Sequence, residues 1–218
     1  MVSAAKRDER RHLASSARWW GETWGFELID ATAGVRAVVQ LTLHPHRRTC
    51  WFWAAVRSVD RPYVLCRDLD LGPPADPLEI RGSALWSHLI CETPLRHWTV
   101  AMEAYALELD PPEEAWGAER GERVGLAFDL EWESEDEPDL LAIDDTCTYE
   151  MACEVHGELQ LGDDTFAIGG TGRRHHSWGV LDPAWFARRW PVGVEALMPC
   201  LIQSEGDATR LDVQQPWP

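Results

Sequence analysis

Apolar and polar residues alternate along much of this chain with a period of two. The clearest stretch is residues 123–133, in which one face is formed by Val124, Leu126, Phe128, Leu130 and Trp132. Residues 35–43 and residues 148–161 alternate in the same way. This period is typical of β-strands that pack one face on a core and turn the other face to water.

Other segments complete a strand-rich pattern. Residues 97–109 are long enough for a helix, but their aromatic and β-branched residues favour a strand. We expect helix in only two places: residues 6–17, which could equally be a frayed tail, and residues 182–189. Apolar runs predict further strands at residues 50–56, 62–66, 78–80, 85–90 and 165–168. The predicted fold class is therefore all-β, as an antiparallel barrel or sandwich.

The length of 218 residues suits a single domain. We expect a tail or short helix at residues 1–17, with no chemical role, and one β domain with a short C-terminal extension at residues 18–218. The formal charge of −17 repels phosphate backbones and anionic membrane surfaces. No stretch approaches the roughly 20 consecutive apolar residues of a membrane-spanning helix. We therefore expect no nucleic-acid partner and no membrane insertion.

Six cysteines are scattered without a Cys-x-x-Cys pair and without close pairing to histidine. This spacing argues against a zinc ribbon or a thioredoxin-type motif. The first residues are charged where a signal peptide needs an apolar region, so we expect a reduced, cytoplasmic protein. His44 and His46, and the acidic run at residues 133–139, are better explained as solvated loops than as metal sites. No metal ligand is assigned.

Proton-transfer and anion-binding groups are most concentrated in residues 169–179, with the sequence GGTGRRHHSWG. In an extended backbone, successive side chains point to opposite faces. One face then carries Arg174, His176 and Trp178. The other face carries Arg173, His175 and Ser177. We assign the inward role to His176, because Arg174 and Trp178 beside it suit an oxygen anion and a developing cation.

Three segments resemble the signature of the hydroxyneurosporene-synthase-like family: Tyr149-Glu150, residues 157–161 and residues 170–179. The family contains carotenoid 1,2-hydratases, AttH-like lipocalin-like proteins and natural-product cyclases. Its usual motif reads Gly-x-Gly-x-Arg-Asp-His-Ser-Trp-Gly, so this chain departs from it at His175. The relatives usually have two lipocalin-like barrels, and this chain resembles the first barrel with a short tail. A site shared between two barrels would be missing here or rebuilt by a homodimer.

The resemblance implies a lipocalin-like barrel that binds a hydrophobic small molecule, such as a polyene, an isoprenoid or a polyketide-like compound. Related enzymes hydrate a double bond or promote cyclisation or isomerisation without a redox cofactor, so no cofactor is expected. Arg174 would hold an oxygen, and His175 or His176 would transfer a proton. Glu150 would pair with either histidine. The residues assigned to substrate binding are Trp178, Tyr149, Trp51, Trp53 and Trp98.

Two alternatives to an enzyme stay open at this stage. A noncatalytic lipocalin-like carrier would have the same cavity but no acid–base pair pointing into it. Clusters of Arg, His and Glu at the end of a barrel also form buried hydrogen-bonded plugs, which need no ligand.

Overall fold

The computed structural model describes residues 2–181, except residues 60, 75–77, 111, 117–118 and 144. The strands are β1 (Val2–Ser3), β2 (Trp20–Asp30), β3 (Val35–His44), β4 (Thr49–Ser58), β5 (Tyr63–Leu71), β6 (Leu78–Arg81), β7 (Leu85–Thr93), β8 (His97–Leu109), β9 (Glu122–Glu133), β10 (Asp139–Ile143), β11 (Thr146–Leu161) and β12 (Asp164–Val180). The 3-10 helices are η1 (Lys6–Glu9), η2 (Pro45–Arg47) and η3 (Pro112–Trp116). The helix predicted at residues 182–189 lies outside the described residues.

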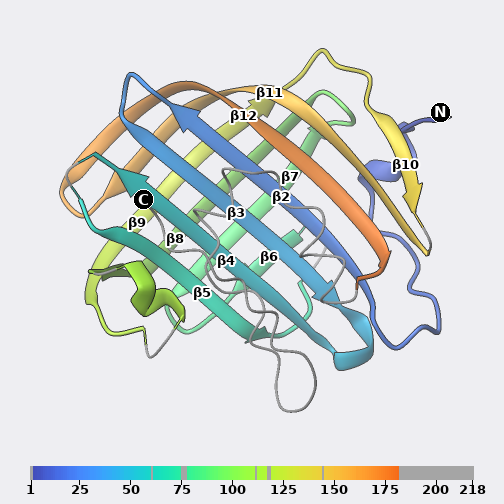
Figure 1. The fold of residues 1–218 in the computed structure, drawn as a ribbon, viewed down its shortest axis with the longest axis horizontal. Helices are drawn as coiled ribbons and strands as arrows, with labels where there is room; N and C mark the ends of the chain where they lie inside the picture. Colours follow the sequence, from blue (N-terminus) through green and yellow to red (C-terminus); the bar gives the residue numbers. More distant parts are fainter. Residues whose placement is uncertain are drawn as a thin grey trace.

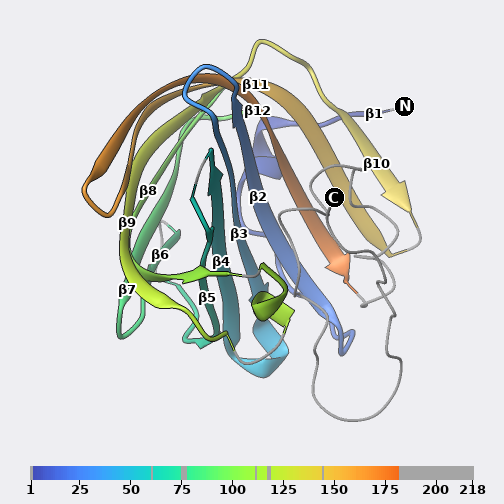
Figure 2. The same ribbon diagram turned by 60° about the vertical axis from the view of Figure 1, so that its left-hand side comes forward.

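Eight antiparallel strands close into a barrel in the order β9, β11, β12, β2, β3, β4, β5 and β8. The sheet curves round on itself in Figure 1 and Figure 2. The prediction of an all-β, antiparallel, lipocalin-like barrel is confirmed. The segment at residues 97–109 is a strand, as its composition indicated. The strands predicted at residues 165–168 and in the motif are one continuous strand, β12.

The barrel closes at two places where one edge of a strand pairs with two different strands in succession. We call these places forks. β8 pairs with β9 along one edge and shares its other edge between β7 and the first residues of β5. β11 pairs with β12 along one edge and shares its other edge between β10 and β9. The hairpin β6–β7 and the pair β1–β10 therefore extend the sheet outside the ring of eight strands.

The apolar face of each alternating strand fills the barrel interior. In β2, for example, Trp24, Phe26 and Leu28 are all buried in the main core. A second apolar cluster lies on the outer face of β3, β4 and β5 and packs against η3. It consists of Val38, Trp53, Ala55, Tyr63, Leu65, Leu109 and Ala115. The strand β4 is consequently covered on both faces, which explains why its sequence is apolar throughout.

The motif strand β12 lies so close to β2 that it requires glycine at residue 172. A Cβ atom at Gly172 would lie 1.9 Å from the carbonyl oxygen of Glu27, whereas a Cβ atom at Gly169 would meet nothing within 4 Å. We expect Gly172→Ala to lower the free energy of unfolding by about 1–3 kcal/mol, because the two strands would have to separate. Gly169→Ala is the matched control in urea denaturation. Equal midpoints for the two variants would contradict this account.

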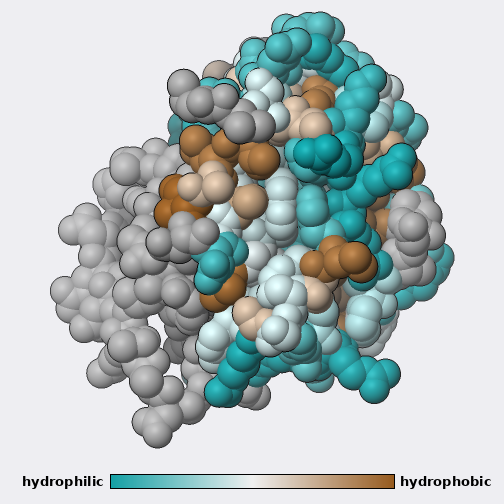
Figure 3. Space-filling view, turned by 90° about the vertical axis from the view of Figure 1, so that its right-hand side faces the viewer, coloured by the Kyte–Doolittle hydropathy of each residue, from teal (hydrophilic) through white to brown (hydrophobic). Residues whose placement is uncertain are grey.

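Hydrophobic residues interrupt the hydrophilic surface on the side where β10 and the N-terminus lie (Figure 3). Leu141 and Ile143 of β10 are 42% and 45% exposed. Among the described residues, no helix is long and apolar enough to cross a membrane.

Candidate functional site

The inner face of β12 carries two deeply buried polar side chains of the motif. Arg174 is 3% exposed and His176 is 1% exposed, while Trp178 is half-buried and packs against the same core. The period of two predicted this placement. β12 is held between β11 and β2, with Tyr149 and Trp24 directly beside His176 in the two neighbouring strands. The site is therefore built on three long paired strands, which fix its side chains.

The N-terminal segment, for which no chemical role is expected from the sequence, lies against this inner face. Asp8 and Glu9 of η1 are buried. The segment is joined to the sheet by the short pairing of β1 with β10 and by a hydrogen bond from the Ala4 amide to the Pro138 carbonyl. Glu9 then contacts both β8 and β12, so the segment links two strands that are not neighbours in the sheet.

Glu9 forms a buried ion pair with Arg174. The Arg174 Nη2 and Nη1 atoms donate to the two Glu9 carboxylate oxygens at 2.7 and 3.2 Å. The same carboxylate accepts hydrogen bonds from the Trp98 indole and the Leu95 amide, each at 2.8 Å. Burial acts to lower the pKa of Arg174, but the nearby Glu9 carboxylate and the Tyr149 hydroxyl outweigh it and raise that pKa overall. Arg174 is therefore a charged group with a matched partner.

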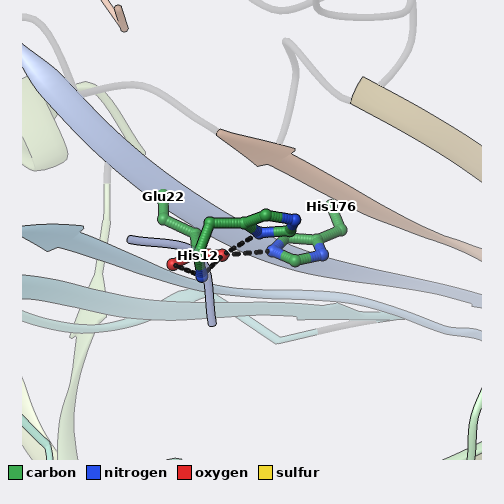
Figure 4. Close-up of side chains that lie close together, drawn as sticks. All are labelled: His12, Glu22 and His176. Carbon is green, nitrogen blue, oxygen red and sulfur yellow. Dashed lines mark hydrogen bonds and ion pairs between the residues drawn. The ribbon is translucent and has the colours of Figure 1, made fainter. Parts of the chain in front are cut away.

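His176, Glu22 and His12 form a second buried network (Figure 4). The Nε2 atom of His176 lies 3.0 Å from Glu22 Oε1, and the Nδ1 atom of His12 lies 2.8 Å from the same oxygen. The other ring nitrogen of His176, Nδ1, lies 2.7 Å from the Asp8 carbonyl oxygen. The side chains of Glu22 and His176 are 1% exposed and that of His12 is 22% exposed, so His12 is the side of this network nearest to solvent.

The positions of the oxygens determine where protons are held. A carbonyl oxygen only accepts, so Nδ1 of His176 must carry a proton. Burial acts to raise the pKa of Glu22, but hydrogen bonds from His12 and His176 outweigh it and lower that pKa overall. Nε2 of His176 lies 3.0 Å from the Glu22 carboxylate and donates to it when that nitrogen is protonated as well. His176 is thus fixed in orientation by one oxygen while it holds a transferable proton toward another.

Aromatic rings surround the two imidazoles. The ring of Trp24 stacks on His176 at a centroid distance of 4.5 Å, and the ring of Trp178 stacks on His12 at 3.8 Å. Tyr149 meets His176 edge-on at 5.8 Å. Aromatic faces stabilise nearby positive charge, whether it lies on an imidazolium or on a bound cation.

Two groups of described residues bring three metal-ligating atoms within 4.8 Å of one another. The first is the His12, Glu22 and His176 network itself. The second, formed by His97, Glu131 and Glu133, lies on the outer face of β8 and β9. Imidazole and carboxylate ligands suit zinc and similar divalent ions, so these are the positions at which a metal would compete with a proton.

A family described as "Domain of unknown function (DUF7064)" matches residues 5–196, which is most of the chain. The chain belongs to the DUF7064 family. The matched region begins before η1, so the N-terminal segment with Asp8, Glu9 and His12 is part of the DUF7064 domain. No curated protein matches the chain.

Several residues predicted for the site lie elsewhere in the DUF7064 domain. Glu150 is exposed on the outer face of β11, where it accepts a hydrogen bond from Arg173 at 2.5 Å. The predicted pairing of Glu150 with His176 is wrong, because the two side chains point to opposite faces of the sheet. His175 is also on the outer face, with its ring in the space left by Gly25.

The predicted tryptophans divide between the two sides of the sheet. Trp98 is in the main core and donates to Glu9, as a residue of the barrel interior should. Trp53 belongs to the outer cluster, and Trp51 lies half-buried against His44 at 4.1 Å on that outer face. The assignment of Trp51 and Trp53 to the cavity is wrong. Phe52 and Ala54 face the core instead. The sequence of a strand that is apolar on both faces does not indicate which face points into the barrel.

Glu22 is a site residue that the sequence reasoning missed, although a signal for it exists. It shares the inward parity of Trp24 and Phe26 in β2, so it is a charged residue at an apolar position of an alternating strand. Such a residue requires a buried partner. For Glu9 and His12 the short N-terminal segment gives no comparable signal.

On the outer face, burial and the charge of Glu150 raise the pKa of Glu27 to about 7, although Arg173 opposes the shift. A raised pKa means that the folded protein keeps a proton that the unfolded chain releases above its ordinary pKa of about 4.5. The contribution of Glu27 to stability is therefore present below pH 4.5 and lost as the pH rises toward 7. We expect Glu27→Gln to reduce the fall in melting temperature over this range. The same dependence of melting temperature on pH in the wild type and in Glu27→Gln would contradict the raised pKa of Glu27.

Proposed function

We propose that this DUF7064 domain binds a hydrophobic small molecule and converts it by acid–base-assisted hydration, cyclisation or isomerisation, without a redox cofactor. The observation that carries the proposal is the buried His176–Glu22–His12 network, in which His176 holds a proton in a fixed direction. The substrate class, a polyene, isoprenoid or polyketide-like compound, is suggested by the resemblance of the motif to hydroxyneurosporene-synthase-like proteins.

The arrangement is suited to protonating a carbon–carbon double bond. His176 would give its Nε2 proton to one carbon, which leaves a cation on the other carbon beside the aromatic faces of Trp24 and Trp178. Water then adds and loses a proton, or a second double bond attacks and the new cation loses a proton from a neighbouring carbon, or a carbon beside the first cation loses a proton. In each case a proton returns to the network, and the partly exposed His12 links it to solvent.

A noncatalytic carrier is the second candidate, and one specific observation favours it. The Arg174 charge, which the family resemblance assigns to a substrate oxygen, is already balanced by Glu9. A barrel whose polar groups satisfy one another could hold an apolar ligand without any chemistry. The carrier and the enzyme differ in whether the His176 proton reaches the ligand.

Deuterium incorporation distinguishes these two functions. The purified protein would be incubated in D₂O with a panel of polyenes and isoprenoids, and the extracts would be analysed by mass spectrometry. All three reactions form a carbon–hydrogen bond with a proton from solvent, so an enzyme yields a labelled product. Saturable binding of the panel without label in any compound would support the carrier and contradict the enzyme.

Two further expectations belong to this proposal. A cytoplasmic location fits the cysteines Cys50, Cys66, Cys91, Cys147 and Cys153, whose thiols are free. A homodimer would supply the second barrel that the related proteins usually have. Size-exclusion chromatography with light scattering would test the homodimer.

A further inference from the structure

The carboxylate of Glu9 occupies a cage of hydrogen-bond donors that belongs to the barrel. Arg174 supplies two N–H groups from β12, Trp98 supplies its indole N–H from β8, and Leu95 supplies its backbone amide from the turn before β8. Leu95 adopts a left-handed backbone with φ of 65°, which is uncommon for a residue that is not glycine. All four donors converge on one carboxylate, three of them from side chains of β8 and β12 and one from the turn before β8.

An anion in this cage is required by the burial of Arg174. The side chain is 3% exposed, and a guanidinium at that depth is strongly unfavourable without a negative partner. The chain supplies that partner from a segment tied to the sheet by a two-residue strand and a few hydrogen bonds. A carboxylate from another molecule would satisfy the same four donors, so the cage selects for a charge rather than for Glu9 itself.

The cage also has a donor that Glu9 does not use. The Nε atom of Arg174 is buried without a hydrogen-bond partner in the part of the chain that the structure describes. Burial and the charge of Glu9 raise the pKa of Tyr149, so its hydroxyl stays a neutral donor. The side chains next to Arg174 are apolar. Met151 and Phe26 are its neighbours in β11 and β2, and Trp98 and Trp132 pack against Phe26. These surroundings match the chemistry of a ligand with a charged end group and an apolar body.

We propose that this cage is the carboxylate-binding site for a long-chain hydrophobic acid, and that Glu9 occupies it when no ligand is bound. The inference rests on the proposed function only in that it names the ligand class of the same barrel. Arg174 and His176 are two residues apart on one strand, a spacing of about 7 Å. A ligand held by its carboxylate at Arg174 therefore presents a bond within a few carbons of that carboxylate to His176.

A matched pair of ligands tests the proposal. The wild-type protein would be titrated with the fluorescent polyene cis-parinaric acid and with its methyl ester, which has the same chain but no charge. We expect the acid to bind about 10- to 100-fold more tightly, because the ester loses the charge-assisted hydrogen bonds of the cage. Equal affinity for the acid and the ester would overturn the inference.

Two variants show whether the preference comes from the cage. Glu9→Gln removes an internal competitor and should raise affinity for the acid while leaving affinity for the ester unchanged. Arg174→Met should abolish the difference between the two ligands. Glu154→Gln, which removes an exposed carboxylate from the same barrel, is the control and should behave as the wild type. A preference for the acid that survives Arg174→Met would place the carboxylate elsewhere and overturn the inference.

Limited proteolysis gives a readout that needs no variant. Displacement of the Glu9 side chain should loosen the chain beside it, so cis-parinaric acid should accelerate tryptic cleavage after Arg10 or Arg11, and the ester should not. Protection of these sites by the acid would contradict displacement.

Failure of the proposed function and failure of the carboxylate-binding site can be distinguished. Tighter binding of the acid without deuterium incorporation indicates a carrier of hydrophobic acids. Turnover of neutral substrates without tighter binding of the acid supports the enzyme proposal and contradicts the carboxylate-binding site.

Discussion

Arg174→Met is expected to lower the free energy of unfolding by about 3–5 kcal/mol. The loss follows from burial, because the Glu9 side chain is 1% exposed and would keep only the Trp98 and Leu95 donors after the guanidinium is removed. An unpaired charge at that depth has no access to water. The measurement is urea denaturation, with the midpoint compared at an unchanged dependence on urea concentration.

The same strand pair offers a matched control. Arg173 and Glu150 form an ion pair on the outer face, where their side chains are 55% and 45% exposed. Arg173→Met should therefore cost no more than about 1 kcal/mol. Replacing both Arg174 and Glu9 by Met should recover most of the loss, since two apolar side chains need no partner. A double variant as unstable as Arg174→Met alone would show that shape, and not charge, causes the effect.

The barrel strands could be predicted because each repeats a short-range pattern. Residues 123–133 alternate strictly, and they form β9 with its apolar residues inside. The same alternation in β12 predicts that Arg174 and His176 share one face, and both are buried on the inner face. A period of two fixes which side chains share a face, so this part of the site was predictable from the motif alone.

The partners of these two residues could not be predicted, because they come from a segment without periodicity. Glu9 meets Trp98 and Arg174 at separations of 89 and 165 residues. Long-range contacts of this kind depend on how the strands close into a ring, and the order of pairing at the forks of β8 and β11 is not encoded in any one strand. The N-terminal segment was therefore predicted as a tail or short helix.

The errors at Trp51, Trp53 and Glu150 have a different cause. A strand such as β4 that is apolar on both faces gives no indication of which residues point inward. Glu150 was placed by its neighbourhood in the motif, yet it stands opposite His175 in register and shares the outer face with it. Tyr149 stands opposite His176 in register and therefore shares its inner face, whereas Glu150 is one residue further along and points outward.

His176→Gln is expected to reduce turnover of a substrate identified by deuterium incorporation by about 10²- to 10⁴-fold, the range for loss of a general acid or base. A glutamine can still donate to one oxygen, but it cannot hold a transferable proton between the Asp8 carbonyl and Glu22. The affinity for the ligand should change little, because the apolar walls are retained. Product formation, ligand affinity and melting temperature would be measured on the same preparations.

His175→Gln is the control, because it changes the neighbouring residue of the same motif on the opposite face. Its ring fills the space above Gly25, so its loss should lower the melting temperature and leave turnover per folded molecule nearly unchanged. His12→Gln tests the network at its more exposed end, where a replacement disturbs the core less, and should slow proton exchange with solvent. If His175→Gln and His176→Gln lose stability equally and neither changes ligand affinity or product formation, the buried network is a structural plug and the enzyme proposal is wrong.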